Sequence, residues 1–347
     1  PERGTMRPRP LSALLLLAAC AASDTEHRSA ADPPLIAREL IARRVASIAD
    51  DSFPLTTPIR IRLLGDTLVV ADIGDDRIAL FDRDLELLHV FGRSGAGPGE
   101  LQGAFELVCA DGLIAVGDMT NQRISFFTPD GQLVREIRLD EALRSFVVGP
   151  DGSVYHVSIS GRDALFTVIA PDGTRRPWGT RPPGLRPGTD DGRRVIEQDE
   201  VLALRTPDGA VHVLDNREGV LIRFDSAGAV QHTVQLPRWL LEPIRKRHEA
   251  LARSLARQGL HVYPGTIAKD LSLTSDGRLL LAVASGDVVA VVVDPATYSP
   301  REIRVPAGEG PWDAARRAVS LALHGDTLYA VTTDGLYAFV LEPAQAG

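Results

Sequence analysis

The sequence of 347 residues contains few cysteines and few lysines. It has two cysteines, Cys20 and Cys109, which excludes a disulfide-rich scaffold. Only Lys246 and Lys269 are lysines among its 38 basic residues, so an arginine cluster carries little information in this composition. The net charge is −8 with the signs scattered along the chain, which argues against nucleic acid as a main partner.

Motifs of metal, phosphate and nucleophilic chemistry are missing as well. The eight histidines show no H-x-H, H-x3-H or H-E-x-x-H spacing, and there is no calcium-type Asp-x-Asp loop. The glycine-rich stretch 92–99 lacks the Lys-Ser/Thr ending of a phosphate loop, and no G-x-S-x-G occurs. The sequence therefore indicates no catalytic residue, no metal ligand and no cofactor.

What the sequence does contain is one strand unit repeated six times. The copies begin at Gly65, Asp111, Asp151, Asp208, Asp276 and Gly325. In the first copy, turn residues separate predicted strands at 58–63, 67–72, 77–82 and 86–91. An array of such units predicts an all-β, six-bladed β-propeller with four antiparallel strands per blade.

The sixth copy ends one strand short, and two links between blades are long. We expect a strand within 39–48 to complete the last blade and close the ring of a domain over 35–347, although a short amphipathic helix fits the same residues. Residues 179–199 are predicted to form an irregular flap. Residues 241–258 predict one inserted helix, with Pro243 in its first turn and one face formed by Ile244, His248, Leu251 and Leu255. Both insertions, with loop 92–103, are expected to roof one mouth of the ring.

The N-terminus has the layout of a signal peptide. Residues 1–5 precede Met6 and are interpreted as an upstream extension, and 6–19 hold basic residues followed by an apolar run. Leu17-Ala18-Ala19-Cys20 resembles the bacterial lipobox, which implies lipidation of Cys20. In the alternative, an ordinary secretory signal, Cys20 is incidental.

With Cys20 lipidated, Cys109 has no disulfide partner. Residues 20–34 then form a flexible tether to the membrane. The mature protein is expected outside the cytoplasm. An aspartate directly after the lipidated cysteine often retains such proteins in the inner membrane; Ala21 stands at this position, so the outer membrane is favoured.

Two segments carry a family resemblance. ADIGDDRIALF (71–81) and GDMTNQRISFF (117–127) resemble the NHL repeat, and 91–101 is similar to the link that follows it. Blade four keeps Asp215 but has Val220 where the repeat has arginine. With the lipobox, the chain resembles bacterial six-bladed β-propeller lipoproteins, most of which have no assigned activity.

Two sets of polar residues are candidates for a site. The repeat-motif set is a polar ring near the mouth or a set of structural ties between loops: Asp72, Asp76, Arg77, Asp118, Asn121, Arg123 and Asp215. The inner-strand set occupies alternate positions of the predicted inner strands, so its side chains are expected on the same face: Arg60, Arg62, Glu106, Arg144, Arg205 and Lys269. This second set predicts an electropositive channel that binds an anion, or charges that pair with one another.

For function, the sequence favours a monomeric, non-catalytic module that binds a peptide, glycan or partner protein at the channel mouth. The alternative is a propeller enzyme of the lyase or lactone-hydrolase type, with a metal in the channel. Metal content of the purified protein discriminates between the two.

Overall fold

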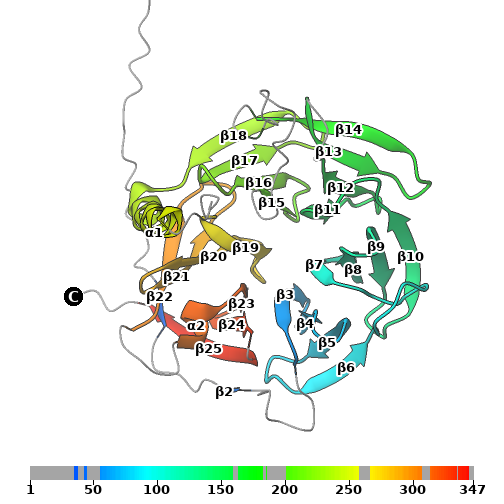
Figure 1. Cartoon of the computed structure of the whole chain (residues 1–347), viewed down its shortest axis with the longest axis horizontal. Helices are drawn as coiled ribbons and strands as arrows, with labels where there is room; N and C mark the ends of the chain where they lie inside the picture. The colour runs from blue at the N-terminus through cyan, green and yellow to red at the C-terminus, as the bar shows by residue number, and fades with distance from the viewer. Residues whose placement is uncertain are drawn as a thin grey trace, which may run out of the picture. The chain divides into compact units, whose positions relative to one another are not determined.

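The computed structural model describes residues 35–37, 43–44, 55–158, 163–182, 185, 201–257, 266–306, 313–333 and 335–343. Within these residues six four-stranded blades stand around a common centre as a β-propeller (Figure 1); blades 1 to 4 are separate sheets, and blades 5 and 6 are joined into one sheet. This confirms the predicted fold class. The segments interpreted as extension, signal peptide and tether (1–5, 6–19 and 20–34) lie outside the described residues, as does most of the flap at 179–199.

Each of the first five blades runs from an inner to an outer strand. Blade 1 comprises β3 (Pro58–Leu64), β4 (Thr67–Asp72), β5 (Arg77–Phe81) and β6 (Leu87–Phe91). Blade 2 comprises β7 (Ala104–Ala110), β8 (Leu113–Asp118), β9 (Arg123–Phe127) and β10 (Leu133–Arg138). Blade 3 comprises β11 (Phe146–Val148), β12 (Val154–Val157), β13 (Ala164–Ile169) and β14 (Arg175–Thr180).

The remaining blades follow the same order. Blade 4 comprises β15 (Val201–Arg205), β16 (Val211–Asp215), β17 (Val220–Phe224) and β18 (Val230–Gln235). Blade 5 comprises β19 (Ala268–Leu273), β20 (Leu279–Ser285), β21 (Val288–Val293) and β22 (Pro300–Arg304). Blade 6 takes β23 (Ser320–His324), β24 (Thr327–Thr332) and β25 (Gly335–Pro343) from the C-terminal end.

The fourth position of blade 6 is filled from the N-terminal side. β1 (Leu35–Ala37) runs antiparallel to β25, with Ile36 opposite Glu342, and parallel to β22, with Leu35 opposite Ile303. β2 (Arg43–Arg44) also pairs with β25. The other residues of the expected strand at 39–48 lie outside the described residues.

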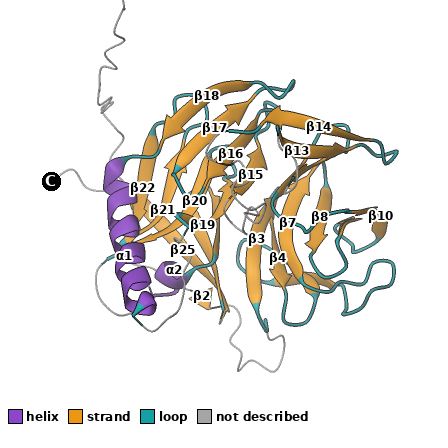
Figure 2. Ribbon diagram, turned by 45° about the horizontal axis from the view of Figure 1, so that its top comes forward, coloured by secondary structure: helices purple, strands orange, loops and turns teal. Residues whose placement is uncertain are grey.

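Two helices occur among the described residues. α1 (Arg238–Ala256) begins three residues earlier than predicted, so Pro243 lies inside the helix rather than in its first turn. Leu240, Leu241 and Ile244 are buried, whereas Leu251, assigned to the same face, is 51% exposed. α1 stands at the edge of the ring beside blades 4 and 5 (Figure 2), not over its centre. The short α2 (Asp313–Arg317) was not predicted.

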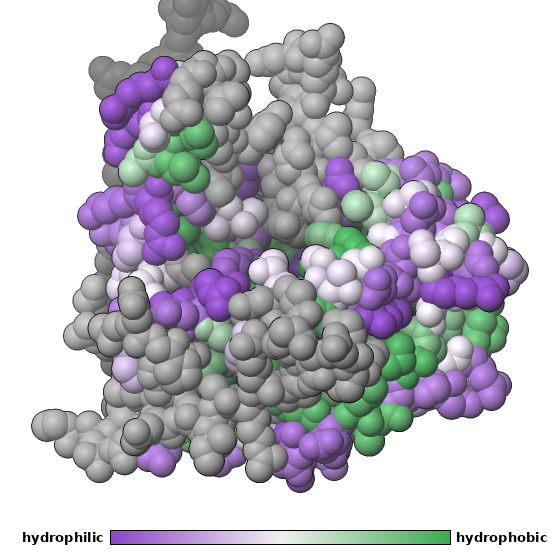
Figure 3. All heavy atoms as spheres, turned by 60° about the horizontal axis from the view of Figure 1, so that its bottom comes forward, coloured by the Kyte–Doolittle hydropathy of each residue, from purple (hydrophilic) through white to green (hydrophobic). Residues whose placement is uncertain are grey.

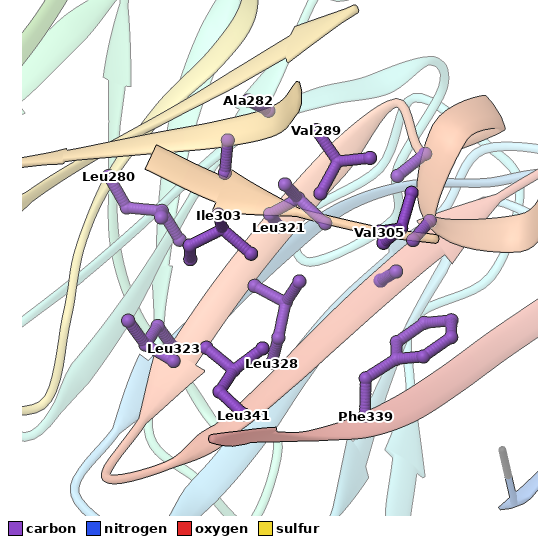
Figure 4. Close-up of a cluster of buried hydrophobic side chains, with 14 of the residues drawn as sticks. Leu280, Ala282, Val289, Ile303, Val305, Leu321, Leu323, Leu328, Phe339 and Leu341 are labelled. Atoms are coloured by element: carbon purple, nitrogen blue, oxygen red, sulfur yellow. The ribbon is translucent and has the colours of Figure 1, made fainter. Parts of the chain in front are cut away.

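The core is divided among the six contacts between neighbouring blades. One buried cluster lies at each contact; between blades 5 and 6, for example, Leu280 and Ile303 meet Leu321, Leu328 and Phe339 (Figure 4). Strands buried on both faces carry apolar residues at nearly every position, as VVAVVV in β21 does. The blades therefore stabilise one another.

The outer surface is largely hydrophilic, with hydrophobic areas between (Figure 3). Four exposed apolar side chains lie on the outermost strands of blades 1 and 2: Leu87, Leu88, Leu133 and Val134. Within the part of the chain that the structure describes, no helix is both long and apolar enough to cross a membrane.

The side chain of Asn216 ties blade 4 to blade 5. It is fully buried, donates to the carbonyl oxygen of Ala268 (2.7 Å) and accepts from the backbone nitrogens of Ile267 (3.1 Å) and Ala268 (2.7 Å). Together with the backbone bond from the Ile267 nitrogen to the Asn216 carbonyl oxygen (3.0 Å), these bonds hold the start of β19 against the end of β16.

We expect Asn216→Ala to lower the free energy of unfolding by about 2–3 kcal/mol, because it leaves buried backbone groups without partners. Gln231→Ala, on the exposed face of β18, is the matched control and is expected to change stability by less than ~0.5 kcal/mol. Chemical denaturation measures the free energy of unfolding of both variants. Equal losses of stability would contradict the proposed role of Asn216 in joining blades 4 and 5.

Candidate polar site in the central channel

Inner strands from four blades bring polar side chains together at the centre of the ring. Arg60 and Arg62 come from β3, Glu106 from β7, Asp270 from β19 and Ser320 from β23. The register shifts between Pro58 and Arg60, and likewise before Glu106 and before Asp270. This repeated β-bulge re-aims the residue that follows it at the same level of each strand.

Arg62 is the hub of the cluster. Its guanidinium donates two hydrogen bonds to the Asp270 carboxylate (2.7 and 2.8 Å) and one to Glu106 (3.2 Å). Blades 1 and 5 are not neighbours, so the Arg62–Asp270 pair crosses the channel. Ser320 donates its hydroxyl proton to Asp270 and accepts from the backbone nitrogen of Ile61 (3.0 Å).

Arg60 is the second arginine of the cluster and makes its net charge zero. Arg60 Nε lies 3.8 Å from Glu106 and 4.0 Å from Asp270, and its guanidinium stacks over the Phe105 ring at 4.8 Å. Arg60, Glu106 and Asp270 are at most 6% exposed. Two positive and two negative side chains thus balance one another at this level.

Their electrostatics follow from this arrangement. Burial by itself raises the pKa of Asp270, but Arg62 and Arg60 outweigh it and hold that pKa below the ordinary value. Burial lowers the pKa of Arg62, but the carboxylates of Asp270 and Glu106 outweigh it and raise that pKa. The Cys109 thiol stays protonated, since burial raises its pKa to about 12 despite the charge of Arg62.

Three members of the inner-strand set are not part of this cluster. Lys269 is the extra residue of its bulge and donates to the carbonyl oxygen of Ala318 (2.8 Å). Arg144 precedes β11 and donates to the carbonyl oxygen of Leu143 (3.1 Å). Arg205 is the last residue of β15, at the opposite end of the strand from the bulges.

The length of the turn after each inner strand explains why the predicted alternation of side chains is wrong on these strands. The turn between the first two strands has two residues in blades 1 and 2, for example Asp111-Gly112 with positive φ angles of 51° and 76°. In blades 3, 4 and 5 it has five: 149–153, 206–210 and 274–278. When positions are counted back from the Asp-Gly pair, the longer turn shifts the alternation by one residue. The prediction therefore named Lys269, whereas its neighbour Asp270 belongs to the cluster. The longer turns, each with Thr or Gly three residues before its Gly, were the signal available in the sequence.

The repeat-motif residues act as ties between loops and blades. Asp72, fully buried, accepts from the backbone nitrogens of Thr56 and Thr57 and pairs with Arg77 (3.1 Å). In the next blade, Asp118 accepts from Asn121 (2.7 Å) and pairs with Arg123 (3.5 Å).

Two further acids of this set also bind backbone. Asp76 accepts from the Gly103 nitrogen (2.7 Å), which links blade 1 to the start of blade 2. Asp215 accepts from the backbone nitrogens of Arg217 and Glu218. These bonds favour the structural interpretation of the motif.

Two buried histidines lie on second strands. Burial lowers the pKa of both His156 and His212 to about 4, so each is neutral in the folded protein near pH 7. Among the described residues, neither ring nitrogen of His212 has a hydrogen-bond partner. Across the described ranges, no group of three His, Cys, Asp or Glu side chains is arranged to hold a metal ion.

No family model and no curated protein matches the sequence. Solved structures match the fold. Virginiamycin B lyase from Staphylococcus aureus matches with a TM-score of 0.53 and 13% identity, over 88% of this chain and 100% of that one. A protein of unknown function from Bacteroides thetaiotaomicron matches with a TM-score of 0.54 and 9% identity, over 87% and 76%. Identities this low show a shared fold alone, and an enzyme and a protein of unknown function both have it.

Removing one partner of the channel cluster is expected to be costly. Asp270→Asn leaves the buried Arg62 with one carboxylate and is expected to lower the free energy of unfolding by about 3 kcal/mol. Asp276→Asn, which also removes a carboxylate paired with arginine (2.7 Å) but at a 57% exposed position, is expected to cost less than ~1 kcal/mol. Denaturant titrations compare them, and a near-neutral Asp270→Asn would show that the pair is not structural.

The buried histidines predict sensitivity to acid. As pH falls from about 6.5 to about 4, the unfolded chain takes up protons on His156 and His212 that the folded chain does not, so stability is lost in that window. At pH 4 each contributes a loss of up to ~3 kcal/mol. We expect His212→Leu to reduce the slope of unfolding free energy against pH in this window, because it removes one of the two buried histidines. Denaturation between pH 7 and pH 4 measures the slope, and an unchanged slope would contradict the prediction.

Proposed function

We propose that this protein is a lipid-anchored, extracytoplasmic propeller with NHL-like blades that acts as a non-catalytic binding module. The observation that carries this is the link 92–103, between blades 1 and 2, whose backbone is bonded by side chains of blade 2 while its outer residues are exposed. A surface loop fixed before binding loses little conformational entropy when a partner docks.

The side chain of Arg123 holds the backbone of the link. It is 3% exposed and donates to the carbonyl oxygens of Ala96 (3.3 Å), Gly97 (2.8 Å) and Glu100 (2.6 Å). Asn121 donates to the carbonyl oxygen of Gly95 (3.0 Å). These repeat-motif side chains therefore serve the loop as well as the blades.

The link also holds itself. The backbone nitrogen of Gly97 donates to the Glu100 carboxylate (2.7 Å), and this bond, together with Arg93, keeps the pKa of Glu100 below its ordinary value. Ser94 donates to the Asp76 carboxylate (2.7 Å). Arg93, 79% exposed at its side chain, and Pro98 face solvent, so they are the residues a peptide, glycan or partner protein would meet first.

The proposed lipid anchor is supported by the sequence. The lipobox-like run that ends at Cys20 supports lipidation there, and residues 20–34 would span from the membrane to the ring. With Ala21 after the cysteine, the outer membrane is favoured.

The second candidate is an enzyme of the lyase or lactone-hydrolase type, supported by the fold shared with virginiamycin B lyase. It would need a metal in the channel. Glu106 and Asp270 are the acids of the channel cluster, and both accept hydrogen bonds from Arg62, so a cation would have to displace a guanidinium that binds Asp270 through two nitrogens. This competition favours the binding module.

A photocrosslinking amino acid in place of Pro98 is expected to give a discrete adduct in intact cells. The same amino acid at Gln231, exposed on blade 4, is the control for random collision. Asp76→Ala, which removes the acceptor for Ser94 and Gly103, is expected to weaken the adduct from position 98. Equal adducts from both positions would contradict a binding surface on the link.

The anchor and the second candidate are tested on protein purified from membranes. Mass spectrometry is expected to find Cys20 as the lipid-modified first residue, and Cys20→Ala to release the protein from the membrane fraction. Elemental analysis of the same sample is expected to find no stoichiometric metal. Calcium or zinc at one equivalent would favour the enzyme, whereas an unmodified Cys20 would refute the anchor alone.

A further inference from the structure

A recess of about 270 Å³ lies between blades 2 and 3, where their first and second strands are joined. This is the opposite end of the strands from link 92–103, so the recess is separate from the surface proposed above. Its wall is mostly apolar and includes Leu113, Ala115, Phe126, Val148 and Pro150.

The charged member of the wall is Arg135. β10 bulges between Leu133 and Arg135, and this register places Arg135 opposite Phe126 on β9. Its guanidinium lies 4.0 Å from the centre of the Phe126 ring and donates through Nη2 to the carbonyl oxygen of Gly152 in blade 3. Gly152, with φ of 77°, carries no side chain, and a Cβ there would come within 3.1 Å of Nη2.

Arg135 is half-buried and has no counter-ion among the described residues. No carboxylate lies within 4.0 Å of its guanidinium among the described residues, and its Nη1 is covered without a hydrogen-bond acceptor. Asp151, on the rim, is engaged instead with the backbone nitrogen and hydroxyl of Ser153. Four other blade arginines each have a carboxylate within that distance: Arg77, Arg123, Arg223 and Arg278.

We propose that this recess binds the carboxylate of a small apolar acid, with the carboxylate on Arg135 and the apolar body against Leu113, Val148 and Pro150. An uncompensated cation beside an apolar wall suits such a ligand because one molecule supplies the missing charge, the missing acceptor and apolar surface to bury. Since Nη1 is covered, the guanidinium rotates over the Phe126 ring to reach the carboxylate.

The cost of burying the cation supports the same assignment. Burial lowers the pKa of Arg135, and the charge of Asp151 offsets this only in part. A ligand carboxylate removes that penalty, whereas an ammonium ion adds to it. The recess should therefore select anions, although the protein carries a net charge of −8.

The probe is benzoate, titrated into the purified full chain and followed by ligand-detected NMR. Benzamide has the same ring and an acceptor but no charge, and benzylamine has the opposite charge. We expect benzoate to bind about fivefold to tenfold more tightly than benzamide, and benzylamine not to bind. Equal affinities for the three probes, or no benzoate binding at all, would overturn the proposal.

Variants place the binding in the recess. Arg135→Gln removes the charge, and Ala110→Leu fills part of the recess while keeping Arg135. Both are expected to weaken benzoate binding about tenfold, whereas Arg238→Gln, a charge removed from an exposed position at the start of α1, leaves it unchanged. Ala110→Leu keeps the test decisive if Arg135→Gln does not fold. Benzoate binding retained by Ala110→Leu would show that the acid sits elsewhere.

Discussion

The structure depends on one packing constraint: a blade buries its faces only against its neighbours. The six apolar clusters lie between blades, and none is confined to one sheet. An open row of such sheets would leave two apolar faces in water, at about 25 cal/mol for each Å² exposed. Closing the ring removes both faces. The pairing of β1 and β25, which joins distant parts of the chain, therefore matters to every blade.

The same closure shapes the channel. Inner strands bring the charged side chains of the channel cluster out of water, so these side chains need opposite charges. Arg62 meets that need by reaching across the channel to Asp270 and sideways to Glu106. The cluster is neutral, and both of its carboxylates are engaged by arginine side chains.

Short-range patterns predicted the blades closely. In blade 1, strand bounds from turns and alternation differ from the observed ones by one residue at most, because a two-residue turn fixes the register on both sides. The motif residues Asp72 and Arg123 were also found from sequence, since their bonds reach only to the adjoining links. The prediction for α1 was less accurate, because its buried face is set by Leu240 and Leu241, which precede the predicted start.

The sequence by itself determined the number of blades, the turns and the alternation within each strand, because those depend on residues close together in the chain. Only the tertiary structure decided which charges meet. A five-residue turn moves Asp270, not Lys269, into the channel cluster, and a bulge leaves Arg135 on Phe126 with no acid in reach among the described residues. Such partners can lie far apart in the chain, 208 positions in the case of Arg62 and Asp270, and they depend on how the ring closes. Sequence spacing carries no record of that geometry.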